Sequence, residues 1–245
     1  PQTIAVLENF DPTNGPQDSY FSDVRKALRE RAVENMMSLA FFPTVDALID
    51  AADEFSGFVS IGPAPIAQDD LDRLYEALSH GVFIDINPAP ALFHSVRPDL
   101  QQTVIDAIYA LREQGRQRIA FIGGAGHMMG SHVFAQDPRT VAFNEWAHLL
   151  DMPTDGYVCA SGPFTVENGR SQAEALLDAC TDDLPDAVLV AADPLAVGVI
   201  QVLAARGLRV PDQIAAVSID NLEVCEYTAP TLSSYAIDRS ELAET

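Results

Sequence analysis

Short apolar runs alternate with amphipathic stretches along almost the whole 245-residue chain, and this alternation limits the possible folds more than any other feature. A run of apolar or β-branched residues is typical of a buried strand, whereas apolar residues three and four positions apart are typical of a helix. Repeated alternation of the two favours parallel sheets joined by crossover helices. The sequence therefore predicts an α/β fold with parallel sheets.

The expected elements fall into two successive series, of about 100 and 140 residues, which predict two Rossmann-like lobes with separate cores. Strands are expected at 4–7, 36–40, 58–61 and 82–86, and then at 118–122, 156–159, 187–191, 215–219 and 232–236. Helices are expected at 19–34, 45–55 and 70–80, and then at 100–114, 139–150, 166–179, 195–206 and from 239.

The segment 87–98 contains three prolines and is expected to be a connector between the two series, with Asp99 as the N-cap of the next helix. Ligands of open parallel sheets bind outside the carboxyl ends of the strands. Two lobes that face each other would therefore form a cleft there. The residues just after each strand are the first candidates for a site.

The chain is strongly acidic, since 14 Lys and Arg against 36 Asp and Glu give 14 − 36 = −22. With 48% hydrophobic residues it nevertheless has enough apolar material for a core. Binding to phosphate backbones depends on clustered Lys and Arg, so the charge excludes nucleic acid as a direct ligand of these residues. Apolar runs are interrupted well before the roughly 20 residues of a membrane helix, so no membrane contact is expected.

The three cysteines, Cys159, Cys180 and Cys225, are odd in number and widely spaced. This pattern favours free thiols in a reducing compartment over a disulfide framework. The first residues, 1–7, also lack a basic stretch followed by an apolar one, so no secretory signal is visible. We therefore expect a cytoplasmic protein.

Carboxylates follow several of the expected strands. Asp85 comes after an apolar strand start at 82–84, and Asp220 ends a strand run. Such carboxylates can accept hydrogen bonds from ligand hydroxyls, or they can cap a neighbouring loop or helix. Asp193 and Asp137 each precede a proline, which is also typical of an N-cap followed by Pro at the first helical position. The residues alone leave both interpretations open.

Arg139 lies in the first turn of an expected helix, where the helix dipole disfavours a cation. This position predicts a partner, which could be an anionic side chain or a ligand rich in oxygens, unless the guanidinium is solvated at the surface. Phe164 precedes Thr165, a candidate N-cap. Its ring could form a hydrophobic staple or stack on the apolar face of a sugar.

Patterns that would indicate catalysis or metal binding are weak. The glycines at 123, 124 and 126 follow a strand, but the next glycine falls at 130, one residue late for a dinucleotide loop, and no helix is expected there. His127 and His132 lie in the same loop without further ligands at metal-binding spacing. Neither a nucleophile motif nor a P-loop is present. We expect no metal, no cofactor and no enzymatic activity.

Several ordered segments together resemble the effector-binding core of the lactose-repressor/galactose-repressor (LacI/GalR) family of transcription regulators. The likeness covers almost the entire chain, and its most specific segments are 115–124, Arg139 with Ala142 and Phe143, 185–188 with 193–198, 210–221 and 230–234. The opening, at 18–25, is most similar to a subgroup that regulates galactoside or related oligosaccharide genes.

The resemblance implies a periplasmic-binding-protein-like fold of type I, with a sugar-like effector in the cleft between the lobes, and a homodimer. The implied lobes are 1–97 completed by 238–245, and 98–237, with crossover strands near 85–98, 219–223 and 232–238. Carried over position by position, it implies effector contacts from seven residues: Arg139, Asp220, Asp85, Phe164, Asp193, Tyr20 and Phe21.

The chain departs from the family pattern in two respects. Many relatives have Asn immediately before the position of Asp193, and Ala192 stands there in this chain. Relatives also begin with a helix-turn-helix headpiece and a hinge helix, which nothing before Ile4 supplies. We therefore expect the DNA-binding headpiece to lie outside these residues.

The sequence thus predicts the effector-sensing and dimerisation core of a sugar-responsive repressor that contacts operator DNA only through the missing headpiece. The alternative is a secreted sugar-binding protein of a transport system, which has the same two-lobed fold. The unpaired cysteines, the missing signal and the repressor-like stretch at 232–234 favour the regulator.

Overall fold

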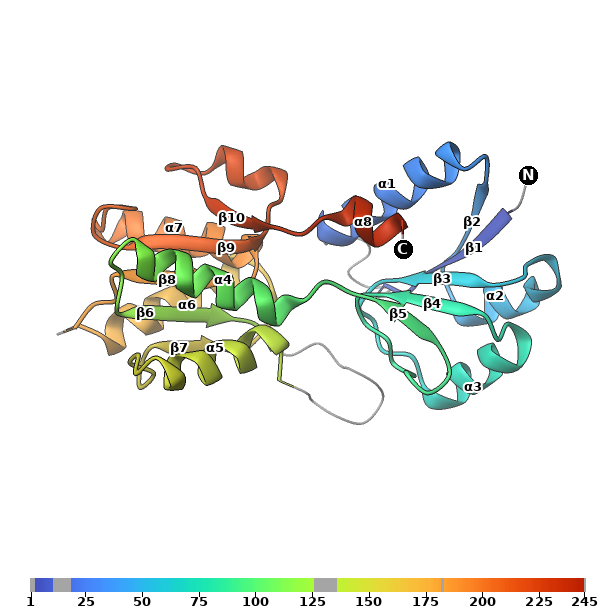
Figure 1. Cartoon of the computed structure of the whole chain (residues 1–245), viewed down its shortest axis with the longest axis horizontal. Coiled ribbons are helices and arrows are strands. Elements are labelled where there is room, and N and C mark those ends of the chain that lie inside the picture. Colours follow the sequence, from blue (N-terminus) through green and yellow to red (C-terminus); the bar gives the residue numbers. More distant parts are fainter. Residues whose placement is uncertain (1–2, 11–18, 126–135, 182, 245) are drawn as a thin grey trace. The chain divides into compact units, whose positions relative to one another are not determined.

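A computed structural model describes residues 3–10, 19–125, 136–181 and 183–244 (Figure 1). The backbone contacts divide the chain into two units. The first contains the residues up to 98 together with 238–244, and the second contains 99–125 together with 136–237. Each unit is built on a five-stranded parallel sheet with helices packed on it, which confirms the α/β fold class.

The first unit has the strand order β2-β1-β3-β4-β5. Its strands are β1 (Thr3–Glu8), β2 (Ser38–Phe42), β3 (Phe58–Ile61), β4 (Gly81–Ile84) and β5 (His94–Val96). Its helices are α1 (Ser19–Glu34), α2 (Val45–Asp50), α3 (Gln68–Ala77) and α8 (Arg239–Glu244), with a short 3-10 helix, η1 (Ala52–Glu54). Helix α1 packs with α8, and α2 packs with α3 on the other face of the sheet (Figure 1).

The second unit has the order β10-β9-β8-β6-β7. Its strands are β6 (Ile119–Gly123), β7 (Val158–Ala160), β8 (Ala187–Val190), β9 (Ala215–Asp220) and β10 (Ser233–Ala236). Its helices are α4 (Leu100–Glu113), α5 (Pro138–Leu149), α6 (Val166–Ala179), α7 (Asp193–Ala205) and the 3-10 helix η2 (Glu223–Tyr227). Helix α4 packs with α5, and α6 packs with α7.

Strand β8 is fully buried along its whole length, as the continuous apolar run at 187–190 predicts for a central parallel strand. It lies between β6 and β9 in the sheet. Helix α4 begins where the sequence predicts, because the Asp99 side chain accepts a hydrogen bond from the backbone N–H of Gln102 at 3.0 Å. The structure therefore confirms both the strand and the cap.

Two expectations were wrong in detail. The segment 87–98 is not only a connector, because it contains the edge strand β5, whose His94 pairs in register with Val82 of β4. Two of the three residues of β5 are exposed and polar, so no apolar pattern announces it. The helix expected at 45–55 ends at Asp50 and continues after a break as η1.

All three cysteines are free thiols. Within the described ranges, no helix combines the length and the apolar character that crossing a membrane requires.

Candidate functional site

Most of the candidate residues lie at the carboxyl edge of the second sheet. Strands β6, β8 and β9 run parallel and end beside one another, and helices α5, α6 and α7 begin just beyond strands at this edge (Figure 1). Four of the seven predicted site residues lie on these strand ends and helix starts: Arg139, Phe164, Asp193 and Asp220.

Arg139 is buried, with 6% of its surface exposed, so the alternative of a solvated surface arginine is wrong. Its guanidinium is held by Asp137 through two bonds, Nε to Oδ1 at 2.8 Å and Nη2 to Oδ2 at 2.7 Å. Nη1 donates to the backbone oxygen of Ala191, just after β8, at 2.8 Å. The predicted anionic partner is therefore present, and the pair fixes the start of α5 against the end of β8.

Asp137 is also the N-cap of α5, since its Oδ1 accepts the backbone N–H of Arg139 at 2.9 Å. The capping interpretation of Asp137 is thus confirmed. Its side chain is almost fully buried, together with that of Arg139. A buried ion pair of this kind holds its geometry because either charge alone would be costly to bury.

Phe164 lies against the same guanidinium, with the Arg139 Cζ atom 4.7 Å from the ring centroid. A cation at this distance over an aromatic face is attracted by the ring. Thr165 is the N-cap of α6, as predicted, but the staple is wrong because the residue at the N4 position is Gly169, which has no side chain to meet the ring. A Cβ on Gly124 would approach the Phe164 ring to 2.6 Å, so this glycine leaves room for the aromatic side chain.

Asp193 is completely buried, and it is not the N-cap of α7. Ala192 holds the cap position, so the capping interpretation of Asp193 is wrong. Its carboxylate instead accepts hydrogen bonds from the hydroxyls of Ser218 and Ser234 and from the backbone N–H of Leu222. Asp193 thus joins α7 to β9 and β10.

The thiol of Cys225 lies beside this network. Burial, together with the neighbouring Asp193 carboxylate, raises the pKa of Cys225 to about 12, because a thiolate there would be poorly solvated and would face a second negative charge. The cysteine is therefore a neutral packing group at ordinary pH, and its thiol has little nucleophilic character.

Asp220 ends β9 with a φ of 113° and is 7% exposed. A non-glycine residue rarely adopts such a backbone angle, and outliers of this kind occur at ligand sites. In the first unit, Asp85 directly follows β4 and has a φ of 73°. Its backbone N–H donates to the backbone oxygen of Val96 at 2.8 Å. Asp85 and Asp220 therefore hold equivalent places at the ends of their strands.

Tyr20 and Phe21 are both buried on α1, with their ring centroids 5.1 Å apart in an edge arrangement. Phe21 also contacts Phe10, at 5.9 Å, just beyond β1. Their roles in effector binding stay predictions, as do those of the other five residues.

Asp137, Ser218 and Ser234 were not among the predicted site residues. The sequence does carry a signal for Asp137, because the helix dipole disfavours a cation in the first turn and a nearby anion offsets this. No local pattern indicates the two serines, since their partner Asp193 lies 25 and 41 residues away.

His127, His132 and Gly130 lie outside the described residues. Among the residues that are described, no group of three His, Cys, Asp or Glu side chains is arranged to hold a metal ion.

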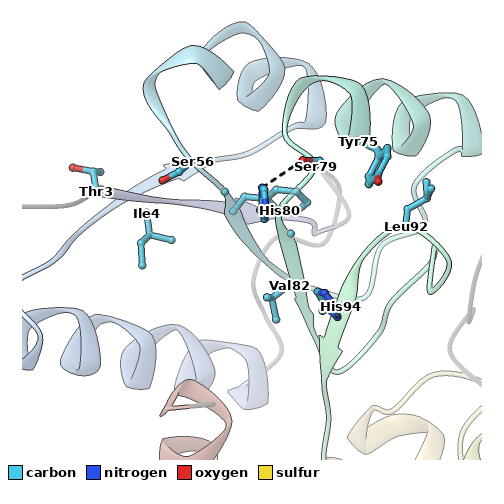
Figure 2. A pocket seen from close by; sticks show the side chains of 12 residues that line it. Thr3, Ile4, Ser56, Tyr75, Ser79, His80, Val82, Leu92 and His94 are labelled. Atoms are coloured by element: carbon cyan, nitrogen blue, oxygen red, sulfur yellow. Dashed lines mark hydrogen bonds between the residues drawn. The ribbon is translucent and has the colours of Figure 1, made fainter.

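A cavity of about 570 Å³ opens in the first unit at the amino ends of its strands (Figure 2). It is lined by the starts of β1, β3, β4 and β5, including His94, and by Ser79 and His80, whose side chains are 3.4 Å apart. Ligands of parallel sheets bind at the opposite edge, where the carboxyl ends lie. This cavity is therefore separate from the predicted effector site.

Comparison with known proteins gives consistent matches. Residues 108–245 match the family of periplasmic binding protein-like domains. The chain is 37% identical over 242 residues to the HTH-type transcriptional regulator LacR of Lactobacillus helveticus, covering 99% of this chain and 72% of the relative. It is 32% identical over 241 residues to the HTH-type transcriptional regulator GanR of Bacillus subtilis, covering 98% and 72%.

The fold is similar to the crystal structure of a LacI family transcriptional regulator from Arthrobacter sp. FB24 in complex with lactose. The TM-score is 0.75 at 20% identity, over 99% of this chain and 86% of the other. Taken with the two regulators, this likeness confirms the periplasmic-binding-protein-like fold. The chain belongs to the LacI/GalR family of transcriptional regulators and corresponds to its effector-binding core.

Proposed function

We propose that this chain senses a sugar for a transcriptional repressor, and that the bound sugar changes how the protein binds operator DNA. The observation that carries the proposal is the buried Arg139–Asp137 pair at the carboxyl edge of the second sheet, with the partly buried ring of Phe164 against it. Two supports come from relatives: the similarity to LacR and GanR, and the lactose held by the similar Arthrobacter structure.

Within this proposal, the side chains have different tasks. Arg139 and Asp220 meet the hydroxyls of the sugar, and Phe164 covers an apolar face of its ring. Asp193 supports the site from behind, because its oxygens already accept three bonds from the protein. Asp85, Tyr20 and Phe21 are the proposed contacts from the first unit.

The regulatory effect requires that the sugar prefer one arrangement of the two units over another. A difference of about 1–3 kcal/mol between the two affinities is typical of allosteric coupling. The relatives are HTH-type regulators, so we propose that a helix-turn-helix headpiece reads the operator and that two copies act as a homodimer. A repressor that controls transcription by binding operator DNA in this way acts in the cytoplasm.

We also infer that the chain is a sensor and not an enzyme. Both relatives are named as transcriptional regulators. The thiol of Cys225, which is next to the site, is held in its neutral form, as burial dictates. The proposed function therefore requires binding alone, without a cofactor.

The proposal is tested by isothermal calorimetry and thermal shift with a panel of mono- and disaccharides. A ligand that binds only the folded state raises the melting temperature. Arg139→Ala is expected to lower the affinity for the sugar that binds by about 10- to 100-fold, which corresponds to the loss of a charge-assisted hydrogen bond. Arg139→Lys, which keeps the cation, serves as a second variant if the alanine variant folds poorly.

Arg118→Ala is the matched control, because Arg118 lies at the amino end of β6, at the opposite edge of the same sheet, and is exposed. It is expected to bind the sugar like the parent. The proposal is wrong if no sugar binds, or if the Arg139 variants bind as tightly as the control.

A further inference from the structure

The charge at the carboxyl edge of the second sheet is unusual for a site that contains an arginine. The Arg139 guanidinium already has a full counter-charge, since both oxygens of Asp137 accept from it. Its third bond, to Ala191, goes to a neutral carbonyl. The pair as a whole therefore carries no net charge.

Along the described part of this edge of the second sheet, no other cation is left to attract an anion. Among the described residues that follow β6 to β9 or lie in the first turn of α5, α6 and α7, Arg139 is the only one with a basic side chain. Asp193 and Asp220 add negative charge at the same edge.

The helix starts do not favour an anion either, although three of them lie at this edge. The positive end of a helix dipole attracts anions unless an acidic side chain already occupies it. Each of the three has one: Asp137 caps α5, Glu167 lies in the first turn of α6, and Asp193 in the first turn of α7.

We propose that Asp137 restricts the effector to uncharged sugars, by neutralising Arg139 so that phosphorylated or acidic sugars are rejected. This inference rests on the proposed function, because it concerns the same site. Asp137 acts through Arg139 and is thus a positioning residue. A sugar phosphate would bring negative charge to an edge where Arg139 is already paired with Asp137 and where Asp193 and Asp220 are acidic, and like charges at close range oppose binding.

The first experiment uses the parent protein and compares matched ligands by isothermal calorimetry at neutral pH. The pairs are galactose with galactose 6-phosphate, glucose with glucose 6-phosphate, and lactose with lactose 6′-phosphate. The uncharged member of at least one pair is expected to bind, and to bind about tenfold or more tightly than its charged partner. A charged member that binds as tightly as its neutral partner overturns the inference and leaves the proposed function standing.

The second experiment changes Asp137→Asn. Asparagine is an equally good N-cap, so α5 keeps its start, but the guanidinium loses its counter-charge. The ratio of charged-ligand affinity to neutral-ligand affinity is expected to rise about tenfold or more. If Asp137 had a purely structural role, its substitution would lower the affinities for both ligands equally and leave this ratio unchanged.

Glu145→Gln is the matched control, because it removes the same charge from an exposed position of the same helix. It is expected to leave the ratio unchanged. An equal rise in both variants, or none in Asp137→Asn, overturns the role of Asp137. If no ligand of any pair binds the parent protein, the proposed function itself fails. If Asp137→Asn does not fold, the comparison of ligands on the parent still decides whether charged sugars are rejected.

Discussion

Tyr157 shows how burial at one residue couples stability to pH. Its hydroxyl donates to the backbone oxygen of Asp183 at 2.6 Å, and its ring lies in the apolar core of the second unit. Burial, together with the nearby Asp183 carboxylate, raises the pKa of Tyr157 to about 12. The folded protein therefore keeps this proton at a pH where an unfolded chain has lost it.

This difference predicts a loss of stability in alkali. An unfolded tyrosine titrates near pH 10, so between pH 10 and about 12 the folded state binds more protons than the unfolded state. By linkage, the free energy of unfolding must then fall as pH rises through this window, and the contribution of Tyr157 is complete only below pH 10. In urea unfolding, Tyr157→Phe is expected to show a shallower decline over this range.

Tyr109→Phe is a suitable control, because Tyr109 is 45% exposed. It is expected to follow the parent curve. Identical pH dependence in the parent and in Tyr157→Phe would contradict the prediction. At neutral pH, Tyr157→Phe is expected to lose only about 1 kcal/mol, the usual value of a hydrogen bond.

Individual site residues were predictable to different degrees. The helix position of Arg139 indicated a partner but left a solvated guanidinium open, and the structure decides for Asp137, two residues earlier. The network of Asp193 could not be predicted, because it depends on how β9 and β10 lie against α7. Sequence patterns report local preferences, whereas a buried carboxylate is defined by donors brought together by the fold.

At the scale of elements, the contact between α6 and α7 depends on two glycines. A Cβ on Gly198 would overlap the backbone oxygen of Val166, and a Cβ on Gly169 would overlap that of Leu195. The two helices therefore approach each other more closely than side chains would permit. This contact holds the starts of both helices, and with them Phe164 and Asp193, beside the sheet edge.

Gly198→Ala is expected to destabilise the protein by about 1–3 kcal/mol in urea unfolding, because the helices must separate to admit the methyl group. The gain in helix propensity from alanine, about 1 kcal/mol, does not offset a clash with backbone. Gln201→Ala, at an exposed position of the same helix, is expected to change stability little. Equal stability of the two variants would show that α6 and α7 can move apart without cost.

Most elements could be predicted, and the exceptions share a cause. The helices at 19–34 and 166–179 have the predicted bounds because their patterns are long and periodic. Strand β5 was missed because it has three residues and pairs on one side only. The 3-10 helix η2 was also not predicted, since five residues are too few to show a period.

At the scale of the whole molecule, the chain passes from one unit to the other and returns. Helix α8, at the C-terminal end of the described chain, packs on α1 of the first unit. Arg239 of α8 lies 3.6 Å from Asp23 of α1, and Glu244 pairs with Arg31. The first unit is thus assembled from both ends of the sequence, and local patterns alone do not indicate this.

The net charge of −22 has its own consequence for the molecule as a whole. So large an excess of acids repels itself in the compact state, and this repulsion lowers stability. Salt screens it, because the Debye length falls from about 30 Å at 0.01 M to about 8 Å at 0.15 M. The surface ion pairs, such as Arg73 with Asp46, are also screened, but exposed pairs contribute only about 0–1 kcal/mol each.

We therefore expect the melting temperature at pH 7 to rise when NaCl is raised from about 0.01 M to about 0.15 M, because relief of repulsion outweighs the weakening of exposed pairs. The control is the same titration near pH 5, where the charge is closer to zero because the isoelectric point is about 4.2. The salt effect should be smaller there, since less repulsion remains to be screened. A melting temperature that falls with salt at pH 7 would mean that the stabilisation from local ion pairs outweighs the repulsion from the net charge. An equal rise at both pH values would mean that the salt stabilises the protein by a mechanism other than screening.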